Sequence, residues 1–396
     1  MVKKMLTIIM IAVMALSLIT SVSAASITVK VDGKTIALDV APVIESGRTL
    51  VPIRAIAEAL GADVQWDDAT KTATVTTVDK EVSVTVNKSS ASVNGEAKTL
   101  DVAAKIIGGR TMLPLRFVGE ALGAKVDYID ATKTVTVDYF TDMSGTIKIT
   151  GSTSVQPIFQ SAADKLMAMN KGLSVTVAGG GSSVGLKDVA SGSSNIGGYS
   201  TELSSSDRTT YPDVVDTKIA MDGIAIITHP SNPVSNLTKQ QIFDIYTGKI
   251  TNWKDVGGED AAIFVQQREA TSGTNKAFKE LLLDSIDKTK KATVVSTATP
   301  HASSGLILQA VASNKNAIGY ESFGYLNSTV KTPTIEGVSA TKANALSGKF
   351  PIVRPLNVLT KGSPSGLNAR FINYILSPEG QKIVNDLGYV PLKIKE

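Results

Sequence analysis

The sequence predicts an α/β domain with a mainly parallel sheet, preceded by two copies of a smaller α+β unit. A stretch in the N-terminal third of the 396 residues returns 62 positions later without a gap. After residue 145, strand patterns alternate with helical patterns, which is typical of an α/β domain. The whole chain is also too long for one ordinary hydrophobic core.

The first 24 residues have the pattern of a secretory signal peptide. Lys3 and Lys4 precede an apolar run over residues 5–19, and Val22-Ser23-Ala24 ends the segment with small residues. We therefore predict cleavage near Ala24 and a secreted chain at the extracellular face of the cell envelope. The apolar run is shorter than the roughly 20 residues that span a bilayer, so an uncleaved anchor is the weaker alternative.

The composition argues against several classes of site. Cysteine is absent, so the sequence offers no disulfide, thiolate metal site, catalytic cysteine or lipid-modified cysteine. The only histidines, His229 and His301, lie far apart, which disfavours a histidine metal site and a Ser-His-Asp triad. The leader carries two lysines and no acid, so the formal net charge of +4 becomes +2 without it. That near balance argues against nucleic acid as a partner. We expect no cofactor and no metal.

The repeat predicts two small domains, at residues 25–78 and 79–140. In each copy a proline opens a short amphipathic helix and a glycine closes it, as Pro52 and Gly61 do in the first copy. The charged residues shared by the copies have no chemistry-bearing neighbours in the sequence, so we interpret them as scaffold. They are Arg48, Arg54 and Glu58 with their counterparts Arg110, Arg116 and Glu120.

These units resemble the small domain named after the N-terminal region of copper amine oxidases. The resemblance covers residues 27–138 and rests on G-R-T-L-V-P-I-R…E-A-L-G-A…W-D-D-A-T-K-T and its copy. No His, Cys or Met cluster is present to bind copper. The resemblance implies a stalk or surface-attachment module, with a cell-wall polymer as its candidate partner.

Three strand-to-helix turns of the C-terminal domain are rich in glycine and hydroxyl side chains. They read G-S-T-S at 151–154, G-G-G-S-S at 179–183 and R-E-A-T-S-G-T at 268–274. Unpaired N–H groups and the helix dipole make such turns suitable for anions, and Arg268 adds a planar cation suited to a tetrahedral oxyanion. Each turn taken alone is also an ordinary N-cap. In open α/β sheets, however, ligands bind beyond the carboxyl ends of strands, where all three turns lie.

At these turns the chain resembles the periplasmic phosphate-binding proteins of bacterial ABC importers. Further shared motifs include N-I-G-G-Y-S-T-E-L (195–203), Q-I-F-D-I-Y-T-G-K-I-T-N-W (241–253) and A-I-G-Y-E-S-F (317–323). The resemblance implies a two-lobed periplasmic-binding-protein fold of type II over residues 146–396. Lobe one is expected at 146–223 and 318–396, and lobe two at 224–317. The implied phosphate ligands are Thr153, Ser154, Ser182, Ser200, Arg268, Ser272, the Gly273 N–H and Thr274.

Two positions depart from that family. Some members have an aspartate where this chain has Ser200, and this acid accepts a proton from phosphate and repels sulfate. A serine can donate or accept, so sulfate or another tetrahedral oxyanion is an alternative ligand. Some members also have an acid at the position of Ala270, where it steadies the arginine.

The predicted function is capture of inorganic phosphate for ABC-type import, with a membrane permease as partner and no catalysis. A hydrolase is disfavoured because no histidine or carboxylate cluster is placed to activate a serine. The remaining alternative is a cell-wall-associated protein that senses phosphate or another oxyanion, or attaches to the wall, without a transport role.

Overall fold

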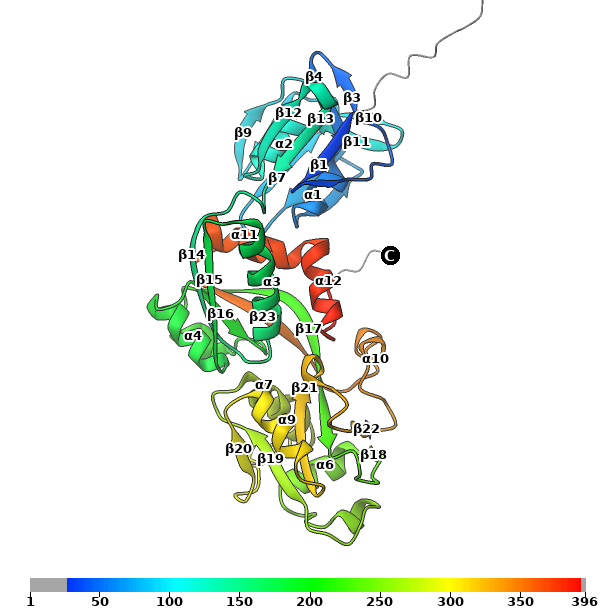
Figure 1. The fold of residues 1–396 in the computed structure, drawn as a ribbon, viewed down its shortest axis with the longest axis vertical. Coiled ribbons are helices and arrows are strands. Elements are labelled where there is room, and N and C mark those ends of the chain that lie inside the picture. The colour runs from blue at the N-terminus through cyan, green and yellow to red at the C-terminus, as the bar shows by residue number, and fades with distance from the viewer. Residues whose placement is uncertain (1–26, 393–396) are drawn as a thin grey trace, which may run out of the picture.

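The computed structural model describes residues 27–392, so the predicted signal peptide lies outside the described residues. Three bodies follow one another along the long axis of the molecule in Figure 1: an N-terminal unit (27–140), lobe one and lobe two. Lobe one comprises residues 145–223 and 353–392, and lobe two comprises residues 224–352. Within the described part of the chain, no helix has the length and apolar character needed to cross a membrane.

The two sequence repeats form one interlocked N-terminal unit. A five-stranded sheet with the order β5-β6-β7-β8-β9 joins the last two strands of the first repeat to the first three of the second. In the sheet β12-β13-β1-β2, strand β1 at the start of the first repeat pairs in parallel with β13 at the end of the second. A third sheet, β10-β11-β4-β3, also mixes the copies. Strand pairing therefore crosses the predicted domain boundary at 78/79, because each repeat supplies strands that complete the other's sheets.

The strands of this unit are short, and each repeat has one helix. The strands are β1 (Thr28–Val31), β2 (Lys34–Thr35), β3 (Val43–Glu45), β4 (Arg48–Pro52), β5 (Asp63–Asp67), β6 (Thr72–Thr76), β7 (Glu81–Thr85), β8 (Ser90–Val93), β9 (Glu96–Thr99), β10 (Lys105–Ile107), β11 (Arg110–Pro114), β12 (Lys125–Ile129) and β13 (Thr134–Asp138). The helices are α1 (Ile53–Ala59), α2 (Leu115–Ala121) and the 3-10 turn η1 (Asp130–Thr132). As predicted, a proline precedes each α-helix, and a glycine with positive φ follows it.

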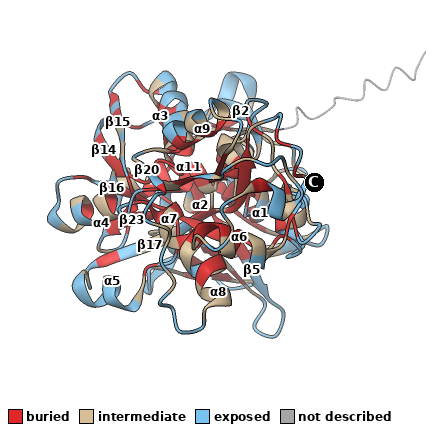
Figure 2. Ribbon diagram, turned by 90° about the horizontal axis from the view of Figure 1, so that it is seen from below, coloured by how far each residue is buried: buried red, intermediate tan, exposed pale blue. Residues whose placement is uncertain are grey.

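Lobe one and lobe two share an eight-stranded sheet with the order β15-β14-β16-β23-β17-β21-β19-β20. The pairs β14-β15, β14-β16, β19-β20 and β19-β21 are parallel. Every pair that involves β17 or β23, the strands that join the lobes, is antiparallel. In Figure 2 the strands at the centre are buried, and the helices turn exposed residues outward.

Helices cover the sheet in both lobes. Lobe one contains β14 (Gly145–Gly151), β15 (Leu173–Gly180), β16 (Ile196–Tyr199), β23 (Val353–Lys361), α3 (Gln156–Met169), α4 (Ser182–Ser191), α5 (Ser205–Thr210), α11 (Gly366–Leu376) and α12 (Pro378–Asp386). Strand β17 (Val214–Thr228) is common to both lobes. Lobe two contains β18 (Asn236–Leu237), β19 (Phe264–Arg268), β20 (Thr299–His301), β21 (Ala317–Ser322), β22 (Thr334–Ile335), α6 (Lys239–Tyr246), α7 (Gly273–Phe278), α8 (Asp284–Ile286), α9 (Ser304–Ala312), α10 (Lys342–Leu346), the 3-10 helices η2 (Trp253–Val256) and η4 (Phe323–Tyr325), and the π-helical turn η3 (Lys279–Leu283).

Strands β17 and β23 carry the chain between the lobes. The first part of β17 pairs with β23, and its last five residues pair with β21 in lobe two. Lobe two extends further than predicted, because Tyr320, Ile335 and Ile352 belong to its core. The chain returns to lobe one through β23, whereas the predicted return near residues 317–319 falls within β21, an internal strand of lobe two.

The N-terminal unit is fixed to lobe one through α11. The buried amide of Asn373 donates to the hydroxyl of Tyr139 at 2.9 Å and accepts from the Val78 N–H at 3.2 Å. Arg370 donates to the Gly123 carbonyl at 2.7 Å and lies over the Tyr139 ring, 4.9 Å from its centroid. One hydrophobic cluster runs without interruption from the N-terminal unit into lobe one. The unit and lobe one therefore share a core.

This junction can be tested at two equivalent glycines. Gly61 and Gly123 both have positive φ, but a Cβ on Gly61 would lie 2.2 Å from the Asn373 carbonyl oxygen, whereas one on Gly123 meets only a Tyr139 ring atom at 4.0 Å. Gly123→Ala should lower the free energy of unfolding by about 1–2 kcal/mol, the cost of a left-handed alanine. Gly61→Ala should lower it by about 3 kcal/mol or more, because the backbone clash is added. Urea unfolding measures both, and equal losses would contradict this junction.

Candidate functional site

The first predicted turn lies at the end of β14, directly before α3. Thr153 and Ser154 are buried there, and tyrosine hydroxyls hold their carbonyl groups. Tyr325 donates to the Thr153 carbonyl and Tyr389 to the Ser154 carbonyl, both at 2.7 Å. The hydroxyls of the same two residues contact lobe two, that of Thr153 at Ser304 and that of Ser154 at Thr274.

The second turn links β15 to α4, and the third links β19 to α7. Gly181 precedes α4 with φ +93°, and a Cβ there would lie 2.7 Å from the Thr271 carbonyl oxygen of lobe two. The Ser183 N–H donates to that same carbonyl at 3.1 Å. In the third turn, the Ser272 hydroxyl caps α7 by accepting from the Thr274 N–H at 3.1 Å. Glycine at 181 is thus needed for the two turns to meet.

All eight predicted site residues come together where the lobes meet. Arg268 donates to the Thr153 hydroxyl at 3.0 Å, and the hydroxyls of Ser154 and Thr274 lie 2.8 Å apart across the cleft. The hydroxyls of Ser182 and Ser200 lie 3.3 Å apart. A Cβ on Gly273 would fall 2.3 Å from the Ser182 Oγ and 2.6 Å from the Ser200 Oγ. Ser272 lies beside Gly273 as the cap of the same helix. The hydrogen-bond donors of lobe one and lobe two therefore meet at one point, and the cleft between the lobes is closed.

A second arginine, absent from the predicted phosphate ligands, lies at the same point. Arg354 of β23 is 1% exposed and donates to the hydroxyls of Ser154 at 3.1 Å and Thr274 at 2.9 Å, one from each lobe. It also donates to Ser200. Its other partner is Asp222 of β17, 2.8 Å away and fully buried. Both crossing strands thus contribute a charged residue to the site.

A second buried acid faces Arg268. Glu321 of β21 is fully buried, and its Oε2 lies 4.0 Å from the Arg268 Nη1. Arg268 is 1% exposed and also donates to the Ser304 hydroxyl at 2.9 Å. Glu321 therefore supplies, from a neighbouring strand, the carboxylate that is absent at Ala270.

Burial and charge act against each other on these acids. Burial raises the pKa of Glu321, and the nearby Arg268 offsets only part of that effect. Burial likewise raises the pKa of Asp222, against the opposing effect of Arg354 and of donors from Ser322 and Phe323. Two guanidinium groups are thereby matched with two carboxyl groups, which makes their burial tolerable.

Neither histidine brings its ring to the hydroxyl groups of the site. His301 contributes its carbonyl to the Arg268 Nε at 3.2 Å, while its ring contacts Gln266 at 2.8 Å. The other histidine, His229, contacts Ser231 at an exposed position. Within residues 27–392, no three His, Cys, Asp or Glu side chains gather as a metal site.

The residues that were missed carry a signal in the sequence. Asp222 and Arg354 each interrupt a run of apolar residues, I-A-M-D-G-I-A-I-I and P-I-V-R-P-L. A charge in the middle of a buried strand is costly unless it is paired. The two interruptions therefore point to a partner, although the sequence does not reveal that each is the partner of the other.

Comparison with protein families assigns both parts of the chain. Residues 30–137 match the copper amine oxidase N-terminal domain, and residues 137–379 match the PBP superfamily domain. The first match spans both sequence repeats, in keeping with the interlocked unit.

Relatives and solved structures agree with the second match. The phosphate-binding protein PstS of Bacillus subtilis is 34% identical over 251 residues, covering 63% of this chain and 81% of that protein. PstS of Borreliella burgdorferi is 30% identical, over 62% of this chain and 90% of the relative. A Clostridium perfringens protein assigned as a phosphate ABC transporter substrate-binding protein, with bound phosphate, superposes with a TM-score of 0.59 and 38% identity, over 63% of this chain and 100% of that chain. An ABC-type phosphate transport receptor from Vibrio cholerae gives 0.52 and 33%, over 62% and 99%. The two lobes and the crossing strands agree with the family match and with these relatives. The chain therefore belongs to the PstS family of phosphate-binding proteins in the PBP superfamily.

Proposed function

We propose that the C-terminal domain captures inorganic phosphate between its two lobes and delivers it to an ABC permease. The observation that carries the proposal is the meeting of Arg268, Arg354 and the hydroxyls of three helix-opening turns at one closed cleft. In the complex, phosphate oxygens replace the direct contacts between these hydroxyls. Family membership and relatives named for phosphate binding support the same ligand.

Capture relies on hydrogen bonds to a charged ligand. Each such bond contributes about 1.5–3 kcal/mol, so four or five reach the roughly −8 kcal/mol of micromolar binding. Because the donors come from both lobes, phosphate binds the closed form best and shifts the equilibrium towards it.

We also propose that the domain binds its ligand without transforming it. The hydroxyls of Thr153, Ser154 and Thr274 face guanidinium groups, which cannot accept their protons. Secretion with cleavage near Ala24 fits this function.

The alternative is a wall-associated protein that senses phosphate or another oxyanion, or attaches to the wall, without serving a permease. The N-terminal unit shares a core with lobe one, so a unit held by a cell-wall polymer would hold the whole molecule. Phosphate uptake by cells separates the two roles: under transport, loss of phosphate binding by the protein reduces uptake, whereas sensing or attachment leaves uptake unchanged.

Arg268→Ala should weaken phosphate binding at least about 100-fold, because the cleft loses its bidentate donor. Arg268→Lys keeps the charge but loses the planar fork, so it should weaken binding about tenfold or more. Calorimetry with phosphate measures both. Arg208→Ala, which removes an exposed arginine of the same domain, is the control and should bind as the parent does. Parental affinity in Arg268→Ala would show that the site is assigned wrongly.

Ser200 makes the site tolerant of sulfate, since a hydroxyl can accept a hydrogen bond from a protonated phosphate oxygen or donate one to a sulfate oxygen. Sulfate should therefore compete measurably with phosphate in the parent chain. Ser200→Asp should abolish this competition while phosphate still binds, because a carboxylate repels a fully ionised anion. Competition calorimetry decides the matter, and no effect of sulfate at large excess on the parent would disprove this account of Ser200.

An ion pair joins the lobes beside the site. Lys276 of α7 donates to Asp207 of α5 at 2.9 Å and to the Tyr199 hydroxyl at 3.2 Å. Burial raises the pKa of Asp207, but the hydroxyl and N–H of Ser204 together with Lys276 outweigh it and lower the pKa to about 2. The lowered pKa means that Asp207 stabilises the folded chain fully above its ordinary value of 3.8, and that this contribution is lost as the pH falls towards about 2. Only the part of it that Lys276 supplies depends on closure, because Ser204 and Asp207 lie in the same lobe.

Lys276→Met should weaken phosphate binding about fivefold at neutral pH, because a partly buried pair contributes about 1 kcal/mol to closure. Asp216→Asn removes a pair that lies within lobe one, with Arg208, and serves as the control. The difference between Lys276→Met and the parent should shrink as the pH falls towards about 2, where Asp207 becomes protonated. Equal affinities of Lys276→Met and the parent at neutral pH would exclude the pair from closure.

A further inference from the structure

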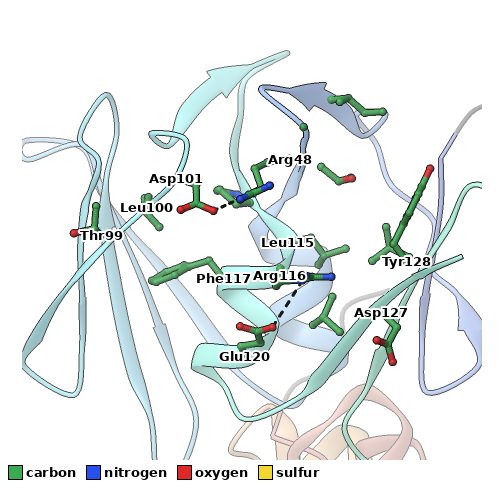
Figure 3. A pocket seen from close by; sticks show the side chains of 16 residues that line it. Arg48, Thr99, Leu100, Asp101, Leu115, Arg116, Phe117, Glu120, Asp127 and Tyr128 are labelled. Atoms are coloured by element: carbon green, nitrogen blue, oxygen red, sulfur yellow. Dashed lines mark hydrogen bonds and ion pairs between the residues drawn. The ribbon is translucent and has the colours of Figure 1, made fainter. Parts of the chain in front are cut away.

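The N-terminal unit contains a pocket of about 640 Å³, within the usual range for small-ligand sites. Both repeats line it: the hairpin of β3 and β4 from the first, and α2, β12 and the segment after β9 from the second. Figure 3 shows the side chains of these elements arranged around it. All residues that line the pocket lie between Ile44 and Val135, whereas the proposed phosphate site joins Thr153 and Ser154 to Arg268 and Thr274.

Aromatic rings and ion pairs line this pocket together. Phe117 of α2 and Tyr128 of β12 border it, and Tyr128 is 41% exposed. Arg48 donates to Asp101 at 2.7 Å. Arg116 lies 3.8 Å from Glu120, which completes a second pair (Figure 3). Both pairs are largely solvent-exposed, so they contribute little to stability and can bond a ligand with little loss.

The charge of the lining favours a neutral ligand. Two arginines stand against three carboxylates, a balance of −1, and the third carboxylate, Asp127, is paired with Lys125 at 3.0 Å. A polyanion such as nucleic acid or a polyphosphate therefore gains nothing here, since its binding depends on excess positive charge. Paired arginine and carboxylate groups instead offer adjacent donors and acceptors.

We propose that this pocket binds a saccharide unit of a glycan. A pyranose ring has an apolar face of C–H groups that suits an exposed aromatic ring, and an edge of hydroxyl groups that both donate and accept. The lining supplies both partners: the rings of Phe117 and Tyr128, and the pairs Arg48–Asp101 and Arg116–Glu120. This binding is independent of the phosphate site.

The first repeat provides a matched control. Its Trp66 is the counterpart of Tyr128 and is 37% exposed, and Arg110–Asp39 and Arg54–Glu58 repeat the two ion pairs. However, Ala55 stands where the second repeat has Phe117. The surface around Trp66 that corresponds to the pocket thus keeps both ion pairs and one aromatic ring but lacks the counterpart of Phe117.

The test uses the full chain and ligand-observed nuclear magnetic resonance titration. The probes are tetrasaccharides of N-acetylglucosamine and of glucose, with an uncharged oligo-alanine peptide for comparison. At least one tetrasaccharide should bind with a Kd of about 1 mM or lower. Tyr128→Ala and Phe117→Ala should weaken it at least about tenfold, and Trp66→Ala less than about twofold. Phosphate affinity should be unchanged in all three variants.

Three results would overturn the proposal. The first is that neither tetrasaccharide binds at about 10 mM. The second is that Trp66→Ala and Tyr128→Ala lose the same amount of saccharide affinity. The third is that the peptide binds and the tetrasaccharides do not. Tyr128 is exposed, so its variant should fold even where Phe117→Ala does not. Because phosphate affinity is measured in the same samples, failure here is distinct from failure of the proposed phosphate site.

Discussion

The ion pair between Arg354 and Asp222 is the contact on which the two-lobed domain depends. It joins β23 to β17, the two strands that cross between the lobes, and both side chains are buried. Removing one partner from such a pair leaves an unpaired charge that costs about 3–5 kcal/mol. Arg354 also donates to hydroxyls of both lobes, at Ser154 and Thr274. The guanidinium that joins the crossing strands therefore also contacts both sides of the closed cleft.

Local sequence patterns were sufficient to predict the three turns, but not the ion pairs and strand pairings between residues distant in the sequence. Glycines, hydroxyls and Arg268 mark the three turns because helix N-termini require them, and their common edge follows from parallel strands. The partners Glu321 and Asp222 could not be predicted, because each is a single acid whose significance depends on a residue distant in the sequence. The predicted end of lobe two also came too early in the chain. The apolar run A-I-G-Y of β21 indicates a buried strand but does not indicate which lobe contains it. Only its pairing with β17 and β19 places it in lobe two.

The N-terminal unit is attached in a way that leaves closure of the cleft free. Asn373 and Arg370 of lobe one contact Tyr139 and Gly123, and the Tyr374 ring of lobe one packs against Phe140. Lobe two lies on the far side of lobe one from the N-terminal unit (Figure 1). Whatever holds the N-terminal unit therefore holds lobe one, and lobe two is the part that moves as the cleft opens.

The interlocked repeats have a consequence for the origin of the unit. A single 62-residue copy cannot complete its own sheets, because β1 needs β13 and β6 needs β7 from the other copy. Two separate chains of one copy each would have to exchange strands to fold, as in a domain-swapped dimer. The tandem is the covalent form of such a dimer, and its linker between β6 and β7 converts a concentration-dependent assembly into an intramolecular one.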